Sequence, residues 1–152
     1  MKTVLLSRTG EESRALIFES GDEVVASLAD YARREGVRAA HFTGIGAFRS
    51  AILGYFDWET KQYLETPIDE QVEVLVLTGD IAWRGSDPVA HVHVVVGCRD
   101  GSAKGGHLLR GIVRPTLEVA FSQAGALERS HDPESGLALI SPEATRKDRP
   151  AG

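Results

Sequence analysis

The sequence predicts an α+β fold in which a mainly antiparallel β-sheet packs against one principal helix. Two observations lead to this prediction. Only one segment, between positions 21 and 36, spaces its apolar side chains three and four residues apart, as an amphipathic helix requires. Turn residues divide most of the remaining chain into short β-branched and aromatic runs, which are typical of strands in an antiparallel meander.

The predicted helix has recognisable ends. Asp22 and Glu23 place acidic side chains at its start, where the positive end of the helix dipole favours them. Arg33 and Arg34 lie in the last turn, and Gly36 can adopt the left-handed conformation that ends a helix. The ends and the apolar spacing together predict about 14 residues.

Seven runs are predicted to be strands, because they are rich in β-branched and aromatic residues. They cover positions 14–18, 37–42, 51–57, 71–83, 91–96, 108–113 and 117–121. Turns are expected at Thr43-Gly44-Ile45-Gly46, Thr66-Pro67, Asp100-Gly101 and Arg114-Pro115. Residues 1–140 are therefore predicted to form one domain. Residues 141–152 lack apolar periodicity and are expected to form a flexible C-terminal tail.

Composition excludes several classes of function. The formal net charge of −5 opposes a general electrostatic attraction to nucleic acid, which requires a basic face. Cys98 is the single cysteine, so no intrachain disulfide can form and a reducing compartment is expected. The first apolar stretch is too short for a signal peptide, and no run approaches the length of about 18 residues for a membrane span. We therefore expect a cytoplasmic protein without a membrane partner.

Three histidines form the candidate site. His91 and His93 are two residues apart on a predicted strand, so both side chains leave the same face, with Cα atoms about 6.5 to 7 Å apart. If Arg99-Asp100-Gly101 is a three-residue hairpin loop, position 93 pairs with 107 and His107 joins them. A two-residue loop would instead turn His107 to the other face, and a bulge at Gly105-Gly106 would shift the register by one.

Three neutral imidazoles suit a divalent metal, above all zinc, and leave its fourth coordination position open for a small ligand. The alternatives are a ligand pocket lined by histidines and purely structural roles. Glu118, on a nearby predicted strand, can orient an imidazole as an outer hydrogen-bond acceptor, or it can be an ordinary solvated strand residue. Cys98 has the opposite parity to the histidines and is expected to be a small buried side chain.

Part of this pattern is similar to the cupin signature. Gly85 is followed after five residues by His91-Val92-His93, as at the start of that metal-binding motif. The cupin glutamate would fall at Gly97 or Cys98, and neither carries a carboxylate. The last cupin histidine would also belong to a more distant strand than His107. The cupin interpretation therefore ranks second.

The order of motifs along positions 13–140 resembles the PPC domain, the plants and prokaryotes conserved domain. The motifs combine glycine-rich turns, a His-x-His element and a Gly-Gly-His-Leu element, and the last two are specific in combination. In chain order they are Gly21-Asp22-Glu23, Thr43-Gly44-Ile45-Gly46-Ala47, Gly54-Tyr55-Phe56-Asp57, Thr78-Gly79-Asp80-Ile81, His91-Val92-His93, Gly105-Gly106-His107-Leu108, Thr116-Leu117-Glu118-Val119 and positions 127–137.

The resemblance implies a compact, mainly antiparallel domain with one principal helix that assembles as a homotrimer. It also implies that His91, His93 and His107 correspond to the family's metal-type histidines. Stand-alone prokaryotic members are commonly labelled DNA-binding proteins without an established activity. The plant proteins add an AT-hook whose Arg-Gly-Arg-Pro core is absent here, which speaks against DNA binding by this acidic chain.

Three functions remain open from the sequence. The first is a trimeric metal-binding domain whose histidine site binds a small ligand or supports assembly. The second is a metal-dependent enzyme, although no nucleophile motif or substrate is specified. The third is a regulatory module that binds DNA or a partner protein.

Overall fold

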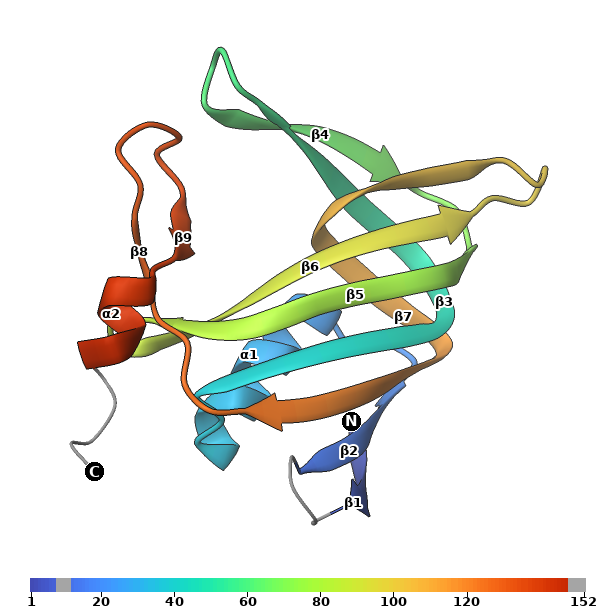
Figure 1. The fold of residues 1–152 in the computed structure, drawn as a ribbon. Helices are drawn as coiled ribbons and strands as arrows, with labels where there is room; N and C mark the ends of the chain where they lie inside the picture. Colours follow the sequence, from blue (N-terminus) through green and yellow to red (C-terminus); the bar gives the residue numbers. More distant parts are fainter. Residues whose placement is uncertain (8–11, 148–152) are drawn as a thin grey trace.

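The computed structural model describes residues 1–7 and 12–147 of the chain (Figure 1). Nine strands and two helices follow one another along these residues. In chain order they are β1 (Lys2–Ser7), β2 (Ser13–Glu19), α1 (Val24–Glu35), β3 (Ala39–Asp57), β4 (Gln62–Ile68), β5 (Val72–Arg84), β6 (Asp87–Gly97), β7 (Ala103–Ala124), β8 (Arg129–His131), β9 (Ala138–Ile140) and α2 (Pro142–Lys147).

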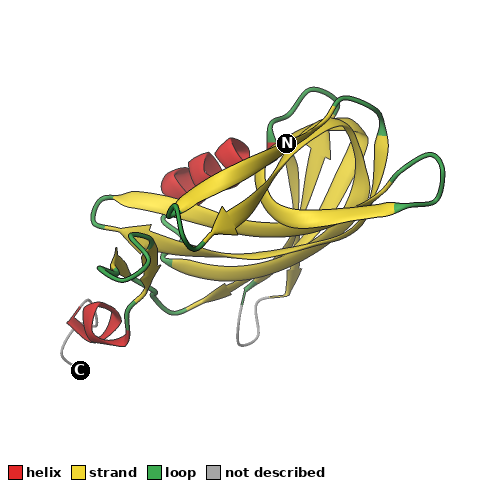
Figure 2. Ribbon diagram, turned by 90° about the horizontal axis from the view of Figure 1, so that it is seen from above, coloured by secondary structure: helices red, strands yellow, loops and turns green. Residues whose placement is uncertain are grey.

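Strands β1 to β7 form one sheet in the order β1-β2-β7-β6-β5-β3-β4, and neighbouring strands are antiparallel. Strand β7 also pairs with β3, so β3, β5, β6 and β7 close on themselves as a small barrel. Helix α1 lies along one side of this barrel (Figure 2). The predicted α+β fold, a mainly antiparallel sheet with one principal helix, is confirmed.

Helix α1 begins and ends close to the predicted residues. The carboxylate of Glu23 accepts hydrogen bonds from the backbone amides of Val25 and Ala26, and Gly36 ends the helix with a φ of 66°. The helix has 12 residues rather than about 14, because Asp22 and Glu23 precede its first turn. Its buried face packs against β6 and β7. That face consists of Val24, Leu28, Tyr31 and Ala32.

The turn expected at Thr43-Gly44-Ile45-Gly46 is wrong, because these residues continue strand β3 through a local register shift. A Cβ atom at Gly44 would lie 2.8 Å from the carbonyl oxygen of Glu118, and one at Gly46 would lie 2.3 Å from that of Thr116. The two glycines therefore serve the close approach of β3 to β7, not a reversal of the chain.

Two proline signals were also misread as turns. Thr66-Pro67 lies inside β4, which is an edge strand of the sheet, the kind of strand in which a proline is tolerated. Arg114-Pro115 lies inside β7, which runs on to Ala124. The short strands β8 and β9 pair only with each other and carry no marked alternation that would have predicted them.

The segment from 141 onward was expected to be a flexible tail. The structure forms α2 there, and the Ser141 hydroxyl accepts a hydrogen bond from the amide of Ala144 at its start. Residues 148–152 lie outside the described part of the chain. Neither helix of the described residues is long and apolar enough to cross a membrane.

The side chains of strand β6 alternate between two faces of the sheet, and both faces matter for the site. Val92, Val94 and Val96 are buried in the core, together with the apolar face of α1. Cys98, which was expected to be buried, is only partly buried and packs against this core. His91 and His93 alternate with these valines, so they lie on the opposite face of the strand.

Candidate metal centre

The hairpin between β6 and β7 places the third histidine. His93 pairs with His107 and Gly97 with Ala103, and the ladder between these pairs runs without a register shift. The amide of Cys98 donates to the carbonyl oxygen of Ser102 at 2.8 Å, and Gly101 adopts a φ of 83°. Of the loops that the sequence left open, the structure therefore forms the three-residue one, and His107 faces His93 across the ladder.

Gly106 precedes His107 for a packing reason. A Cβ atom at Gly106 would lie 2.9 Å from the carbonyl oxygen of Gly54, because β3 pairs with β7 at this point. The same strand pair places Gly54 directly opposite His107. The glycine pair thus lets β3 and β6 approach β7 closely beside the histidines, and the β6–β7 ladder itself contains no bulge.

The three imidazole rings face one another. Their centroids are separated by 5.0, 5.1 and 5.4 Å. The Nε2 atoms of His91 and His93 are 3.2 Å apart, and one potential ligand atom from each of the three residues lies within 4.8 Å of the others. A tetrahedral zinc with bonds of about 2.0–2.1 Å sets its nitrogens about 3.3–3.4 Å apart, so the His91–His93 spacing already fits.

Burial favours the neutral form of two of these imidazoles. It lowers the pKa of His107 to about 4, with smaller contributions from the charges of His91, His93 and Arg129. Burial also lowers the pKa of His93, with a smaller contribution from the charge of His91. The Nδ1 atom of His107 is buried and has no hydrogen-bond partner among the described residues. Since a metal ligand must be a neutral imidazole with a free lone pair, this donor set fits a divalent cation.

Asp80 of β5 is the carboxylate beside the cluster. It pairs with His91 in the β5–β6 ladder, and its Oδ2 atom lies 3.6 Å from Nδ1 of His91. Its Oδ1 atom accepts a hydrogen bond from Nη2 of Arg129 at 2.5 Å. Burial alone would raise the pKa of Asp80, but the contacts with His91 and Arg129 outweigh it and hold the pKa below its ordinary value. Asp80 is therefore an anion between a cation and a candidate ligand.

Aromatic side chains border the cluster on the side of His107. The ring of Tyr63, on β4, lies 4.8 Å from the ring of His107 at an angle of 33°. Tyr63 also contacts the ring of Phe56 on β3, at 5.5 Å between centroids. The β3–β4 hairpin, drawn at the top of Figure 1, thus contributes to the site although β4 was not predicted from the sequence.

Glu118, the carboxylate singled out in the sequence, lies elsewhere. It is exposed, pairs with Ile17 and Ile45, and is 11 residues beyond His107 along β7. The structure instead brings Asp80 to His91. The Thr78-Gly79-Asp80-Ile81 motif contained this residue, but only the β5–β6 register places it opposite a histidine. Tyr63 and Arg129 gave no comparable signal.

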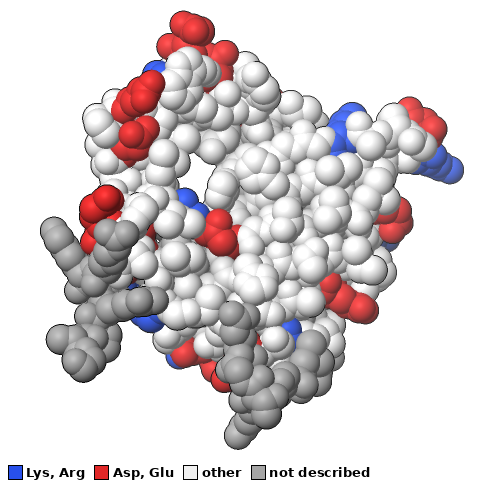
Figure 3. All heavy atoms as spheres, viewed as in Figure 1, with Lys and Arg blue, Asp and Glu red and all other residues white. Residues whose placement is uncertain are grey.

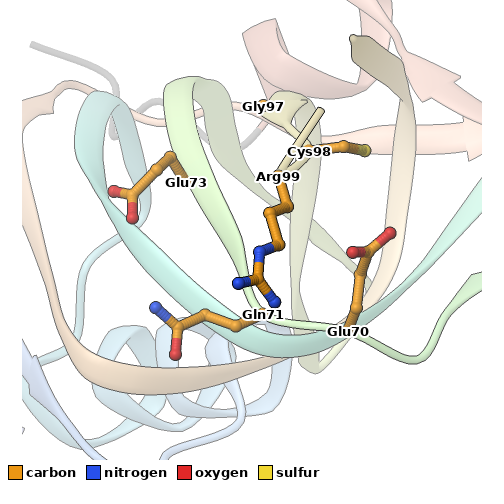
Figure 4. A pocket seen from close by; sticks show the side chains of 6 residues that line it. All are labelled: Glu70, Gln71, Glu73, Gly97, Cys98 and Arg99. Carbon is orange, nitrogen blue, oxygen red and sulfur yellow. The ribbon is translucent and has the colours of Figure 1, made fainter. Parts of the chain in front are cut away.

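Two larger hollows lie away from the histidines. One, of about 610 Å³, is lined by apolar Ile45 and Leu75 and by the carboxylates of Glu73 and Glu118, among others. A neighbouring hollow of about 400 Å³ holds the side chain of Arg99, which extends between Glu73 and Glu70 (Figure 4). A smaller hollow, of about 200 Å³, borders His93 itself and so adjoins the cluster.

A closed antiparallel barrel with a three-histidine cluster on its outer face defines the class of domain. The family model described as the Plants and Prokaryotes Conserved (PCC) domain matches residues 7–124. The chain belongs to this family, which is the PPC domain that its motifs resemble. Among curated proteins no match was found.

Three solved structures illustrate the relationship. The plant- and prokaryote-conserved protein of Pyrococcus horikoshii is 26% identical, with a TM-score of 0.80 over 90% of this chain and 97% of its own. A metal-containing protein of Archaeoglobus fulgidus is 34% identical, with a TM-score of 0.79 over 93% and 99%. A "putative DNA-binding protein" of Ralstonia eutropha JMP134 is 31% identical, with a TM-score of 0.79 over 84% and 90%.

Proposed function

We propose that the domain binds one divalent cation, for which zinc is the leading candidate, through His91, His93 and His107. The observation that carries this proposal is the convergence of three imidazoles whose ligand atoms lie within 4.8 Å of one another. The buried and unpartnered Nδ1 atom of His107 supports it, because such an atom is costly unless it finds a partner. The metal-containing relative from Archaeoglobus fulgidus gives further support.

We propose further that the fourth position of this cation receives a small ligand. When bound, zinc would act there as a Lewis acid toward a donor atom of that ligand. The 200 Å³ hollow beside His93 offers room for the remainder of the molecule. Its wall is mostly apolar and includes Val76, Val95 and the hydroxyl-bearing Thr78. A small, largely apolar molecule with one donor group fits this setting.

Metal analysis of protein purified without an affinity tag tests the cation site. We expect close to one equivalent of zinc or another divalent metal per chain in the wild type. The variant in which His91, His93 and His107 are all replaced by alanine should lose it. Less than about a tenth of an equivalent in the wild type, unchanged in the triple variant and after incubation with zinc, would contradict the proposal.

We propose that the chain assembles as a homotrimer, as the family resemblance implies. An apolar strip supports this part of the proposal, since large exposed apolar patches mark interaction surfaces. The strip consists of Ile45, Leu75, Val76 and Val95, which are 62, 54, 41 and 37% exposed. It adjoins the site, because Val76 and Val95 line the same hollow as His93.

Sedimentation of Leu75→Glu tests the assembly. A charge in the apolar strip should shift the protein from trimer toward monomer, whereas Leu139→Glu, at an exposed leucine outside the strip, should leave the trimer intact. A wild type that sediments as a monomer at micromolar concentration would contradict the trimer. It would leave the cation site standing, because all three histidines belong to one chain.

DNA is not part of the proposal, although two similar proteins carry names that include it. The net charge is −5, and acidic side chains outnumber basic ones on the face drawn in Figure 3, where no basic stripe is seen. A protein that grips phosphates needs such a stripe. We expect no gel shift of duplex DNA at low salt.

A further inference from the structure

The chain continues beyond the last residue of the family match as a C-terminal arm, defined here as residues 127–141. The arm leaves β7 and attaches to the end of β5 (Figure 1). The amide of Trp83 donates to the carbonyl oxygen of Leu127 at 2.9 Å, and Trp83 and Glu128 form a parallel bridge. Strands β8 and β9 of the arm pair with each other, so beyond this backbone attachment at its base the arm contacts the barrel through side chains.

Arg129 is the arm's innermost side chain. It is 8% exposed, although arginine is almost never buried without a partner. Its Nη1 atom donates to the carbonyl oxygen of Ala138 at 3.1 Å, within the arm itself. Its Nη2 atom donates to Oδ1 of Asp80 at 2.5 Å, across to the barrel. The guanidinium therefore connects β9 of the arm to the carboxylate that faces His91.

The two oxygens of Asp80 have different neighbours. Because Arg129 holds Oδ1, the carboxylate is fixed with Oδ2 toward Nδ1 of His91, 3.6 Å away. The other ring nitrogen of His91, Nε2, lies 3.2 Å from Nε2 of His93, at the centre of the cluster. A carboxylate behind a histidine fixes its tautomer and ring orientation in metal sites.

We propose that Arg129 is a positioning residue of the cation site, which acts on His91 through Asp80. The inference rests on the proposed function, the binding of a divalent cation by the three histidines. It makes the C-terminal arm, which lies outside the matched residues 7–124, part of that site. Detaching Arg129 frees Asp80 to turn away from His91, and the site then loses affinity even though all three ligands remain.

A purely structural role for Arg129 is the competing explanation, and Arg38 provides the matched control. Arg38 forms an ion pair with Glu128, the residue next to Arg129 on the same arm, and its guanidinium lies 4.5 Å from the ring centre of Trp83. It therefore also attaches the arm to the barrel, through Glu128 and Trp83, whereas Arg129 does so through Asp80. Replacing either arginine removes one positive charge and one attachment of the arm.

The test is a Co²⁺ titration of the full-length protein, with Co²⁺ alone as the probe and affinity read from its visible absorption. Arg129→Met should weaken Co²⁺ binding about tenfold, the lower range for outer partners of metal ligands. Arg38→Met should stay within about twofold of the wild type. The double variant Arg129→Met/Asp80→Asn should bind no more weakly than Asp80→Asn alone, because the two residues act in series.

Other outcomes overturn the inference. Equal Co²⁺ affinity in Arg129→Met and Arg38→Met would assign Arg129 a structural role only, and so would additive losses in the double variant. If circular dichroism shows that Arg129→Met does not fold, Arg129→Lys takes its place. Wild-type Co²⁺ affinity in both Arg129→Lys and Asp80→Asn would then overturn the inference. A wild type that binds no Co²⁺ would instead overturn the proposed cation site itself.

Discussion

The β6–β7 hairpin and the C-terminal arm both reach the histidine cluster, but they are built in different ways. The hairpin belongs to two strands of 11 and 22 residues inside the seven-stranded sheet. The arm pairs two strands of three residues each, which form a sheet of their own. The hairpin supplies all three histidines, whereas the arm supplies Arg129.

The difference shows how a site divides between rigid and attached parts. Short two-stranded pairs are only marginally stable by themselves, so the arm depends on its contacts with β5. The three histidines lie on the element that can open only with the whole sheet, and Arg129, which holds the carboxylate beside His91, lies on the element that can open locally. Four predictions test this division.

The largest effect is expected at the hairpin. His107→Ala should weaken zinc binding by more than about 100-fold, since the loss of a direct ligand exceeds the 10–100-fold range of an outer partner. His131→Ala is the matched control, because His131 lies on the arm and is exposed. Competition with a chelator measures both affinities. Similar affinities of the two variants would remove His107 from the site.

A smaller effect is expected at Asp80, where the two regions meet. Asp80→Asn keeps the size of the side chain but weakens its contacts with His91 and Arg129, so zinc affinity should fall about 10- to 100-fold. Glu118→Gln should leave the affinity unchanged, because Glu118 is exposed and 11 residues beyond His107 on β7. The reverse order of effects, measured by the same competition, would make Glu118 the orienting carboxylate.

Two loop glycines should separate global from local stability. Gly101 of the hairpin and Gly136 of the arm adopt φ values of 83° and 77° with open space around them, so alanine adds backbone strain of about 1–2 kcal/mol and no clash. Gly101→Ala should lower the midpoint of urea unfolding. Gly136→Ala should leave that midpoint nearly unchanged and speed amide hydrogen exchange at Arg129–His131. Equal midpoints in the two variants would show that the arm unfolds with the sheet.

The smallest effects concern two loop carboxylates, each of which accepts hydrogen bonds from the hydroxyl and the amide of a nearby serine. Hydrogen bonds from the hydroxyl and amide of Ser102 lower the pKa of Asp100, and those of Ser135 lower the pKa of Asp132. Because both folded pKa values lie below the ordinary value of 3.8, their contribution to stability is present above this pH and is lost as the pH falls through the folded pKa. Carboxyl carbon NMR titration should find both midpoints below 3.8, and a midpoint at or above it would contradict the loop geometry.

The same two regions show what the sequence could predict. Local turn geometry limited the hairpin to a few registers, one of which, the three-residue loop Arg99-Asp100-Gly101, pairs His93 with His107, and the structure forms that register. The contact of Arg129 with Asp80 spans 49 positions and depends on how the arm packs, which no periodicity reveals. For the same reason Glu118 was chosen as the nearby carboxylate in place of Asp80.

The misread turns have a related cause. Gly44 and Gly46 are consistent with a turn in the sequence, but the structure uses them for the contact of β3 with β7, more than 70 positions away. A glycine required by a close backbone approach and one required by a turn are identical in a sequence. The helix was predicted closely because its caps and apolar spacing are local.

An anomalous difference map from crystals of untagged protein, recorded above and below the zinc absorption edge, tests the central claim most directly. One peak per chain, within bonding distance of His91, His93 and His107 and absent in His107→Ala, is the predicted result. A map without a peak at these histidines after zinc soaking, or a peak held by other residues, would contradict the account.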